Sequence, residues 1–221
     1  MKFFYLIVFS LVFQARVFCQ ANYSENLWLG ALVNGKVSKS SSLTGDIGYR
    51  TYENFIKEKR TFLARIVFEK ALSEKHIVGI GYAFFDHFSK NSGINLEQRP
   101  FLQYRSRFQK NKFDFQLRIR NEFRFFTSRS EFNNRSRVQF QIRYNLFEGR
   151  LIPIFGVETF LSTGKKSLFE NRFTAGLNLR INQKISALVF YTLQTQSSYK
   201  GIQNIVGIQT QINLSENNKS K

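Results

Sequence analysis

The sequence predicts an all-β fold: an antiparallel up-and-down transmembrane β-barrel of about twelve strands, with ten as the alternative number. Apolar and polar residues alternate along most of the chain, short and long connections alternate between the segments, and one face is aromatic while the other carries arginine. The clearest segment is "KFDFQLRIRNEFRFF", residues 112–126, in which every second residue from Phe113 onward is apolar with one exception. Such a strand needs an apolar environment on one side and a polar environment on the other.

An export signal is expected at the start of the 221-residue chain, over residues 1–19. Lys2 precedes an apolar run that is too short to span a bilayer as a helix, and we expect cleavage after Cys19. A lipid-modified Cys19 is the alternative, although the preceding "RVF" lacks the small residues of such sites. The expected division is then an N-terminal segment over 20–26, a barrel over 27–214 and a polar tail over 215–221.

The chain carries a formal net charge of +18. A charge of this size can indicate nucleic-acid binding, but export and the placement of the arginines in strands argue against it, so no nucleic-acid partner is expected. The sequence shows no metal-ligand spacing and no glycine-rich phosphate loop. We therefore expect no cofactor, no metal and no assigned catalytic residue.

Eleven alternating segments are visible, at 27–37, 43–52, 60–72, 76–86, 96–108, 113–126, 134–146, 153–162, 169–181, 185–196 and 202–214. Turns such as "QKNK" and "FEGR" are short, whereas connections such as "ENFIKEK" and "TSRSEFN" are longer. This alternation is typical of a bacterial barrel with one periplasmic and one external rim. Because bacterial barrels normally have an even number of strands, we expect a twelfth strand, hidden in "ANYSENLW" or in a merged segment.

Arginine occupies the strands, whereas lysine lies in turns, loops and tails. Planar guanidinium groups suit a crowded interior of ion pairs, so the sequence predicts a charge network in the lumen. Its expected members are Arg99, Arg105, Arg107, Arg118, Arg120, Arg124, Arg135, Arg137, Arg143, Arg172, Arg180, Glu97, Glu122, Glu158 and Glu170. With Arg50, Arg65, Asp46, Glu69 and Asp114 in the same phase, thirteen arginines face seven carboxylates.

The opposite face would contact outer-membrane lipid. Shifting the segment 113–126 by one residue would place three arginines in lipid, at up to about 2–4 kcal/mol each near the midplane. This cost favours phenylalanine outside and arginine inside. The alternative is a soluble periplasmic β-protein with a polar exterior.

Several short motifs resemble the domain-of-unknown-function family 2490, whose exported bacterial members are regarded as outer-membrane barrels. The similar stretches are "LWLG" with Trp28, "GYR" at Gly48 to Arg50, "GIGYAF" with Gly79, Gly81 and Tyr82, "EQRPF", "RIRNEFR", "NRSRVQF", "VETF" and "ENRFTAGL" with Asn171. The resemblance implies the fold and the location and brings no activity. One departure is the last strand, which ends "IQTQINL" without the terminal aromatic residue common in such barrels.

Three functions follow from these features. The first is a narrow, anion-favouring channel or transport protein for small anionic solutes, against the alternative that the arginines pair into a structural plug. The second is a lipid-modifying enzyme of the outer membrane, in which His87, beside Asp86, would lie near Glu97 and several serines. The third is an adhesive surface protein that uses its loops. The sequence does not specify the oligomeric state.

Overall fold

Strands account for nearly all of the chain that the computed structural model describes, namely residues 23–52, 59–90, 93–127, 129–163, 168–196 and 199–214. The strands are β1 (Tyr23–Lys36), β2 (Ser41–Tyr52), β3 (Lys59–Ala71), β4 (His76–Ser89), β5 (Gly93–Lys110), β6 (Phe113–Phe126), β7 (Arg129–Tyr144), β8 (Leu151–Thr163), β9 (Leu168–Arg180), β10 (Ile185–Gln196) and β11 (Tyr199–Asn213). A single 3-10 turn, η1 (Phe147–Gly149), precedes β8. The expected signal peptide and the polar tail after Leu214 lie outside the described residues.

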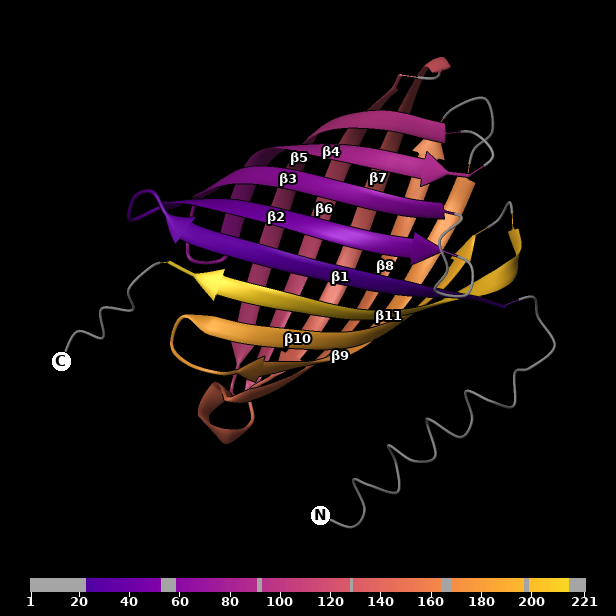
Figure 1. Ribbon diagram of the computed structural model, residues 1–221. Helices are drawn as coiled ribbons and strands as arrows, with labels where there is room; N and C mark the ends of the chain where they lie inside the picture. Colours follow the sequence, from indigo (N-terminus) through magenta and orange to yellow (C-terminus); the bar gives the residue numbers. More distant parts are fainter. Residues whose placement is uncertain are drawn as a thin grey trace.

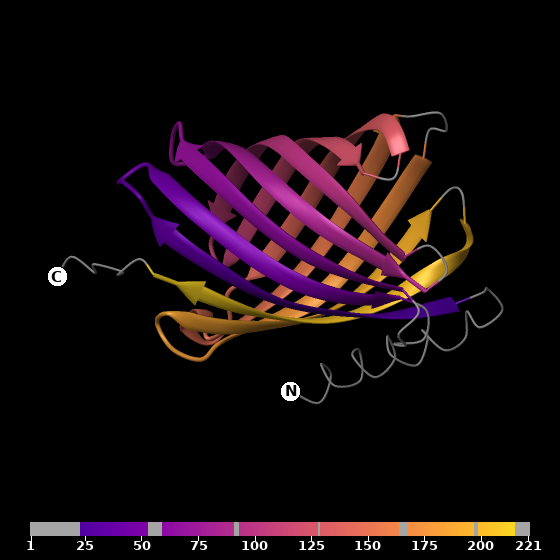
Figure 2. The same cartoon turned by 45° about the horizontal axis from the view of Figure 1, so that its top comes forward.

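The eleven strands form one closed barrel in which each strand pairs with its neighbours in the sequence (Figure 1). Ten of the pairings are antiparallel, and the ring is closed by a parallel pairing of β1 with β11, from Tyr23 opposite Ile202 to Asn34 opposite Asn213. Figure 2 shows β1 and β11 side by side along the lower front of the barrel.

The predicted strand number, twelve or ten, is wrong. An odd number of strands, joined here by ten antiparallel steps, leaves the first and last strands running in the same direction, and a parallel ladder joins them without a further strand. The part of "ANYSENLW" that the structure describes, from Tyr23 onward, is the beginning of β1 itself and not an additional strand. The barrel therefore begins earlier than the expected Leu27.

Other boundaries differ modestly. Much of the connection "TSRSEFN" is strand, since β7 begins at Arg129, and β5 extends to Gly93 at the same rim. The central parts of three other long connections, 53–58, 164–167 and 197–198, lie outside the described residues. What the structure does show is that the short turns gather at one rim and the long connections at the other.

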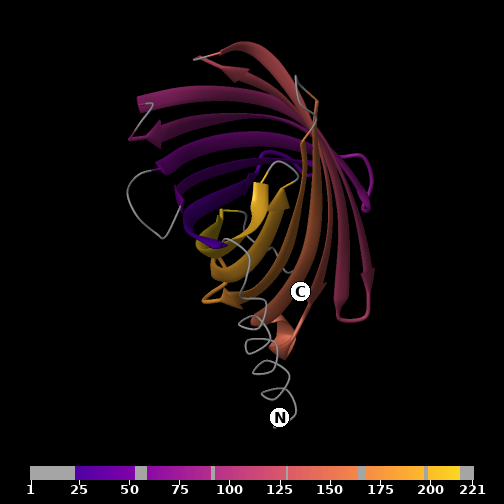
Figure 3. The ribbon, with the colours of Figure 1, turned by 90° about the vertical axis from the view of Figure 1, so that its right-hand side faces the viewer.

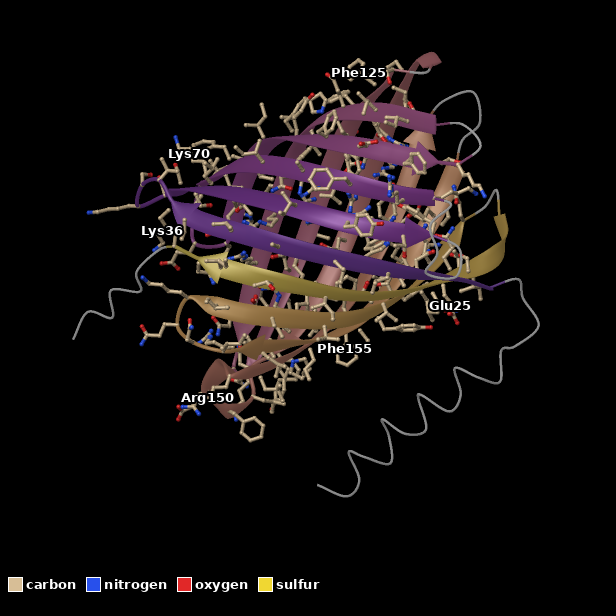
Figure 4. All side chains as sticks on the ribbon, viewed as in Figure 1. Glu25, Lys36, Lys70, Phe125, Arg150 and Phe155 are labelled. Carbon is tan, nitrogen blue, oxygen red and sulfur yellow. The ribbon has the colours of Figure 1, made fainter. Side chains whose placement is uncertain are left out.

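The outer surface of the barrel is apolar. Ile47 is 54% exposed and Phe155 59%, and exposed large apolar side chains far outnumber buried ones among the described residues. Phe125 and Phe155 project away from the barrel, whereas nitrogen and oxygen atoms crowd its inside (Figure 4). Proteins in water show the opposite distribution, with apolar side chains inside.

The interior lies between two curved walls, which Figure 3 shows from the side. Side chains alternate strictly along β6, so that Gln116, Arg120 and Glu122 are buried while Leu117 and Ile119 are exposed. Neighbouring strands keep the same phase through the pairing register. The alternation of the sequence thus becomes a charged lumen inside an apolar cylinder.

Candidate functional site: the arginine-lined lumen

Glu122 on β6 lies at the centre of the lumen and is 1% exposed. Its carboxylate oxygens are 2.7 Å from Arg135 Nη2 and 2.6 Å from Arg137 Nη1, both on the neighbouring strand β7. From the other side, Arg99 and Arg120 approach to 3.4 and 3.8 Å. One buried carboxylate therefore holds four guanidinium groups in place.

Similar pairs continue to both sides of Glu122. Glu97 on β5 is fully buried, and its oxygens lie 2.7 Å from Arg99 Nη2 and 2.5 Å from Arg124 Nε. On the far side, Glu158 of β8 is 2.8 Å from Arg137 Nη2. Because Arg99 and Arg137 each contact two carboxylates, the ion pairs form one continuous chain across these strands.

The chain ends on β9. Glu158 also accepts a hydrogen bond of 3.0 Å from Arg118, and its second oxygen lies 4.0 Å from Arg172. Arg172 in turn pairs with Glu170 at 2.7 Å. The ion-pair chain therefore spans the strands from β5 to β9.

A smaller group of pairs lies nearer the short-turn rim. Glu69 on β3 accepts a bond of 2.5 Å from Arg105 Nη2 and one of 2.6 Å from Gln103. Gln103 accepts in turn from Arg120 Nη2 at 2.7 Å, which connects this group to the central one. Asp46 on β2 pairs separately with Arg65, whose Nε donates to it at 2.8 Å.

Three of the expected network residues join no ion pair in the described part of the chain. Arg107 has a buried Nε without an acceptor, and Arg143 donates to Gln141 at 2.9 Å. Arg180 is exposed at the end of β9. All three lie toward the short-turn rim, where Asp114, opposite Arg143 in the register, makes no ion pair either.

Aromatic side chains inside the lumen were missed by the sequence reasoning, which placed the aromatic residues on the outer face. Arg120 lies 4.3 Å from the ring centroid of Phe101, and Arg137 lies 4.6 Å from that of Phe160. Phe101 and Phe160 are 2% and 1% exposed. Stacking of a cation on a ring face adds attraction that ion pairs alone do not supply.

These inward rings can be recognised in the sequence only when the pairing register of neighbouring strands is known. Phe101 shares the phase of its neighbours on β5, and the residue opposite it on β4 is Gly81. A Cβ on Gly81 would lie 2.2 Å from Phe101 Cζ, and one on Gly207 would lie 2.0 Å from Phe190 Cζ. Glycine on one strand therefore makes room for an inward ring on the next.

A cavity of about 190 Å³ remains within the lumen toward the long-connection rim. Eight guanidinium groups line it, with one carboxylate, that of Glu122. A second cavity, of about 80 Å³, lies farther along β1 and β2 and shares Arg50, Leu63 and Arg65 with the first. These three residues form the boundary between the two spaces, which we call the neck. The arginines of the first cavity are Arg50, Arg65, Arg99, Arg120, Arg124, Arg135, Arg137 and Arg172.

His87 lines the first cavity and lies near Glu97, as the enzyme hypothesis expects. Its Nε2 is 3.0 Å from Glu97 Oε2, and its Nδ1 is 2.9 Å from Thr61 Oγ1. The order hydroxyl, imidazole, carboxylate resembles that of hydrolases. Thr61, however, is only 2% exposed, so its hydroxyl is closed to a substrate and the three groups act here as a link between β3, β4 and β5.

Within the described ranges, no group of three or more His, Cys, Asp and Glu side chains is arranged to hold a metal ion. None of the helices there is both long and apolar enough to cross a bilayer.

The family of the chain follows from its sequence. Residues 25–205 match the family described as "Protein of unknown function (DUF2490)". The chain belongs to this family. The DUF2490 match begins within β1, ends within β11 and includes every member of the ion-pair chain. No curated protein matches the sequence.

Solved structures of porins are similar to this DUF2490 chain in outline. The KdgM porin matches with a TM-score of 0.47 at 14% identity, over 80% of this chain and 87% of that one. The NanC porin matches with a TM-score of 0.45 at 13% identity, over 80% and 90%. OmpT, an outer-membrane protein of Vibrio cholerae, matches with a TM-score of 0.43 at 6% identity, over 74% and 77%.

Proposed function

We propose that this DUF2490 chain is an outer-membrane β-barrel whose lumen is a narrow passage for small anions. The membrane location is supported by the inverted distribution of side chains, with an apolar surface around a polar interior. In lipid every backbone polar group needs an internal partner, and a closed barrel supplies one for each strand.

The preference for anions rests on one observation, the cavity lined by eight guanidinium groups and a single carboxylate. Rings of basic side chains favour anions in pores. Glu122, which lines the cavity, is within ion-pair distance of four of these arginines, and carboxylates outside the lining hold three others. Guanidinium groups therefore outnumber carboxylates around the space. A cation would meet repulsion there, and a small anion would meet several donors.

Conductance tests the proposal directly. The mature protein is folded into detergent, its closed barrel is checked by faster gel mobility without boiling, and it is then inserted in planar bilayers with a potassium chloride gradient. We expect small unitary currents and a reversal potential that shows chloride to be more permeant than potassium. A protein that stays soluble without detergent and shows no boiling-dependent mobility would contradict the membrane location.

A filled, structural barrel is the second candidate. Phe101, Phe160 and Glu97 are almost completely buried, so much of the cross-section is occupied. Barrels of this size lie between the small filled ones and the wide water-filled porins. A protein that inserts stably and passes no current in the gradient experiment would favour this second function.

A further inference from the structure

Arg50 differs from every other arginine that lines the first cavity. Each of the other seven lies within ion-pair distance of a carboxylate. Arg50 contacts no carboxylate in the described residues, although it belongs to the neck between the two cavities. Its positive charge therefore has no carboxylate partner among the described residues at the neck.

Aromatic stacking holds Arg50 in position instead. Its guanidinium lies 4.1 Å from the ring centroid of Trp28, the residue opposite it on β1. A guanidinium that uses its face for stacking keeps its N–H donors free along its edge. Those donors make no hydrogen bond to the described residues and border the cavity.

The support for Trp28 comes from the neighbouring strands. Phe190 of β10 meets Trp28 edge to face, with 6.4 Å between the ring centroids. Phe190 reaches this position because Gly207, which faces it on β11, has no Cβ. The platform beneath Arg50 is thus built by rigid packing across three consecutive strands of the ring.

Trp28 itself has a free donor. Its indole Nε1–H is buried and has no acceptor in the described part of the chain. Buried polar groups normally have partners, and one without a partner costs free energy. An uncompensated guanidinium edge and an unpaired indole N–H therefore lie on adjacent strands at the same level of the lumen.

We propose that Arg50 and Trp28 form a binding site for a small oxyanion, a phosphate or a carboxylate, at the neck of the lumen. An anion with at least two oxygens satisfies both donors and neutralises the unpaired charge. The site deepens the proposed function, since it names the point at which a passing anion is held. It also makes Arg50 and Trp28 determinants of selectivity.

Trp28 provides its own probe, because it is the only tryptophan in the chain. Folded protein in detergent is titrated with inorganic phosphate, with potassium chloride at matched ionic strength as the control for screening. We expect a saturable change in tryptophan fluorescence with phosphate that exceeds the change with chloride. A linear, non-saturating change, or equal responses to the two salts, would overturn the site.

The decisive variant is Arg50→Gln, which keeps a polar side chain and removes the charge. We expect phosphate affinity to fall by about tenfold or more, as for the loss of a hydrogen bond to a charged group. Arg60→Gln is the matched control, because Arg60 is exposed and is stacked on Phe88 away from the cavity. Unchanged phosphate affinity in Arg50→Gln would overturn the site.

A third variant guards against failure of Arg50→Gln to fold. Trp28→Phe keeps the aromatic platform and removes the indole donor, and calorimetry replaces fluorescence as the measurement. We expect weaker phosphate binding in a barrel that still migrates faster without boiling, and wild-type affinity would count against the site. An anion-selective current without phosphate binding would overturn the binding site and leave the proposed anion passage standing. Phosphate binding without any current would support the binding site and refute the anion passage.

Discussion

The two walls of the lumen are built differently. From β5 to β9 the inward side chains are mainly arginines and carboxylates, joined in the continuous chain through Glu97, Glu122 and Glu158. On β10, β11 and β1 they are amides, hydroxyls, aliphatic groups and aromatic rings packed against glycine, with Thr192 2% and Ile205 0% exposed. One wall is held by charge and the other by shape. The first cavity borders the charged wall, the second borders the neutral wall, and β2 and β3 line both.

The difference shows that the interior of one barrel can be filled by ion pairs on one side and by packed neutral side chains on the other. A carboxylate shared by several arginines fixes side chains that would otherwise repel one another. A neutral wall allows close approach of rings, and Arg50, on the adjoining strand β2, faces Trp28 of this wall in place of a carboxylate. The asymmetry is thus the source of both the rigid part of the lumen and its uncompensated charge.

The largest effect is expected from Glu122→Gln on the charged wall. Removing this carboxylate leaves four buried arginines without their shared partner, and breaking a buried ion pair typically costs about 3–5 kcal/mol. The free energy of unfolding is measured by urea titration in lipid vesicles. Glu148→Gln, an exposed change on η1, is the control and should leave the midpoint unchanged. A midpoint for Glu122→Gln equal to that of the control would contradict the role of the shared carboxylate.

A smaller loss is expected on the neutral wall from Gly207→Ala. The new Cβ meets the ring of Phe190, and overpacking of this kind typically costs about 1–3 kcal/mol. Gly45→Ala is the matched control, because a Cβ there meets no atom within 4 Å. The same urea titration should separate the two variants, and equal midpoints would show that shape does not hold this wall.

The smallest effect is expected from Thr192→Val, which keeps the side-chain volume and removes one hydroxyl. Thr192 and Thr174 share a hydrogen bond of 2.8 Å, and a neutral bond of this kind contributes about 0.5–1.5 kcal/mol. Thr210→Val, on the outer face of β11, serves as the comparison. If the Thr192→Val loss matched that of Glu122→Gln, the two walls would not differ in the way described.

Much of the architecture was predictable from single segments. The alternation over residues 113–126 predicts both the strand and its inner face, because arginine in lipid is costly and phenylalanine is not. Ten of the eleven strands begin within a few residues of their expected positions, and "TSRSEFN" is the clearest exception. The apolar–polar alternation of a segment depends on the environment of its two faces and not on its partner strand. Strands could therefore be predicted without knowing how they pair.

Features that depend on the register were not predictable. The parallel closure involves two strands at opposite ends of the sequence, and no pattern within either one specifies its partner. The inward Phe101 looks like any other strand phenylalanine until it is placed opposite Gly81. For the same reason the sequence grouped arginines by phase and did not single out Arg50, whose neighbour Trp28 is known only from the pairing of β1 with β2.

The parallel closure of the ring has a consequence for the orientation of the chain across a bilayer. The first strand enters the barrel at the rim of the long connections, and the last strand leaves it at the rim of the short turns. A barrel with an even number of strands returns the polypeptide to the side from which it started. Here Tyr23, at the start of β1, and Asn213, at the end of β11, lie at opposite rims, so that tags joined at these two strand ends would be open to protease from opposite sides of the membrane.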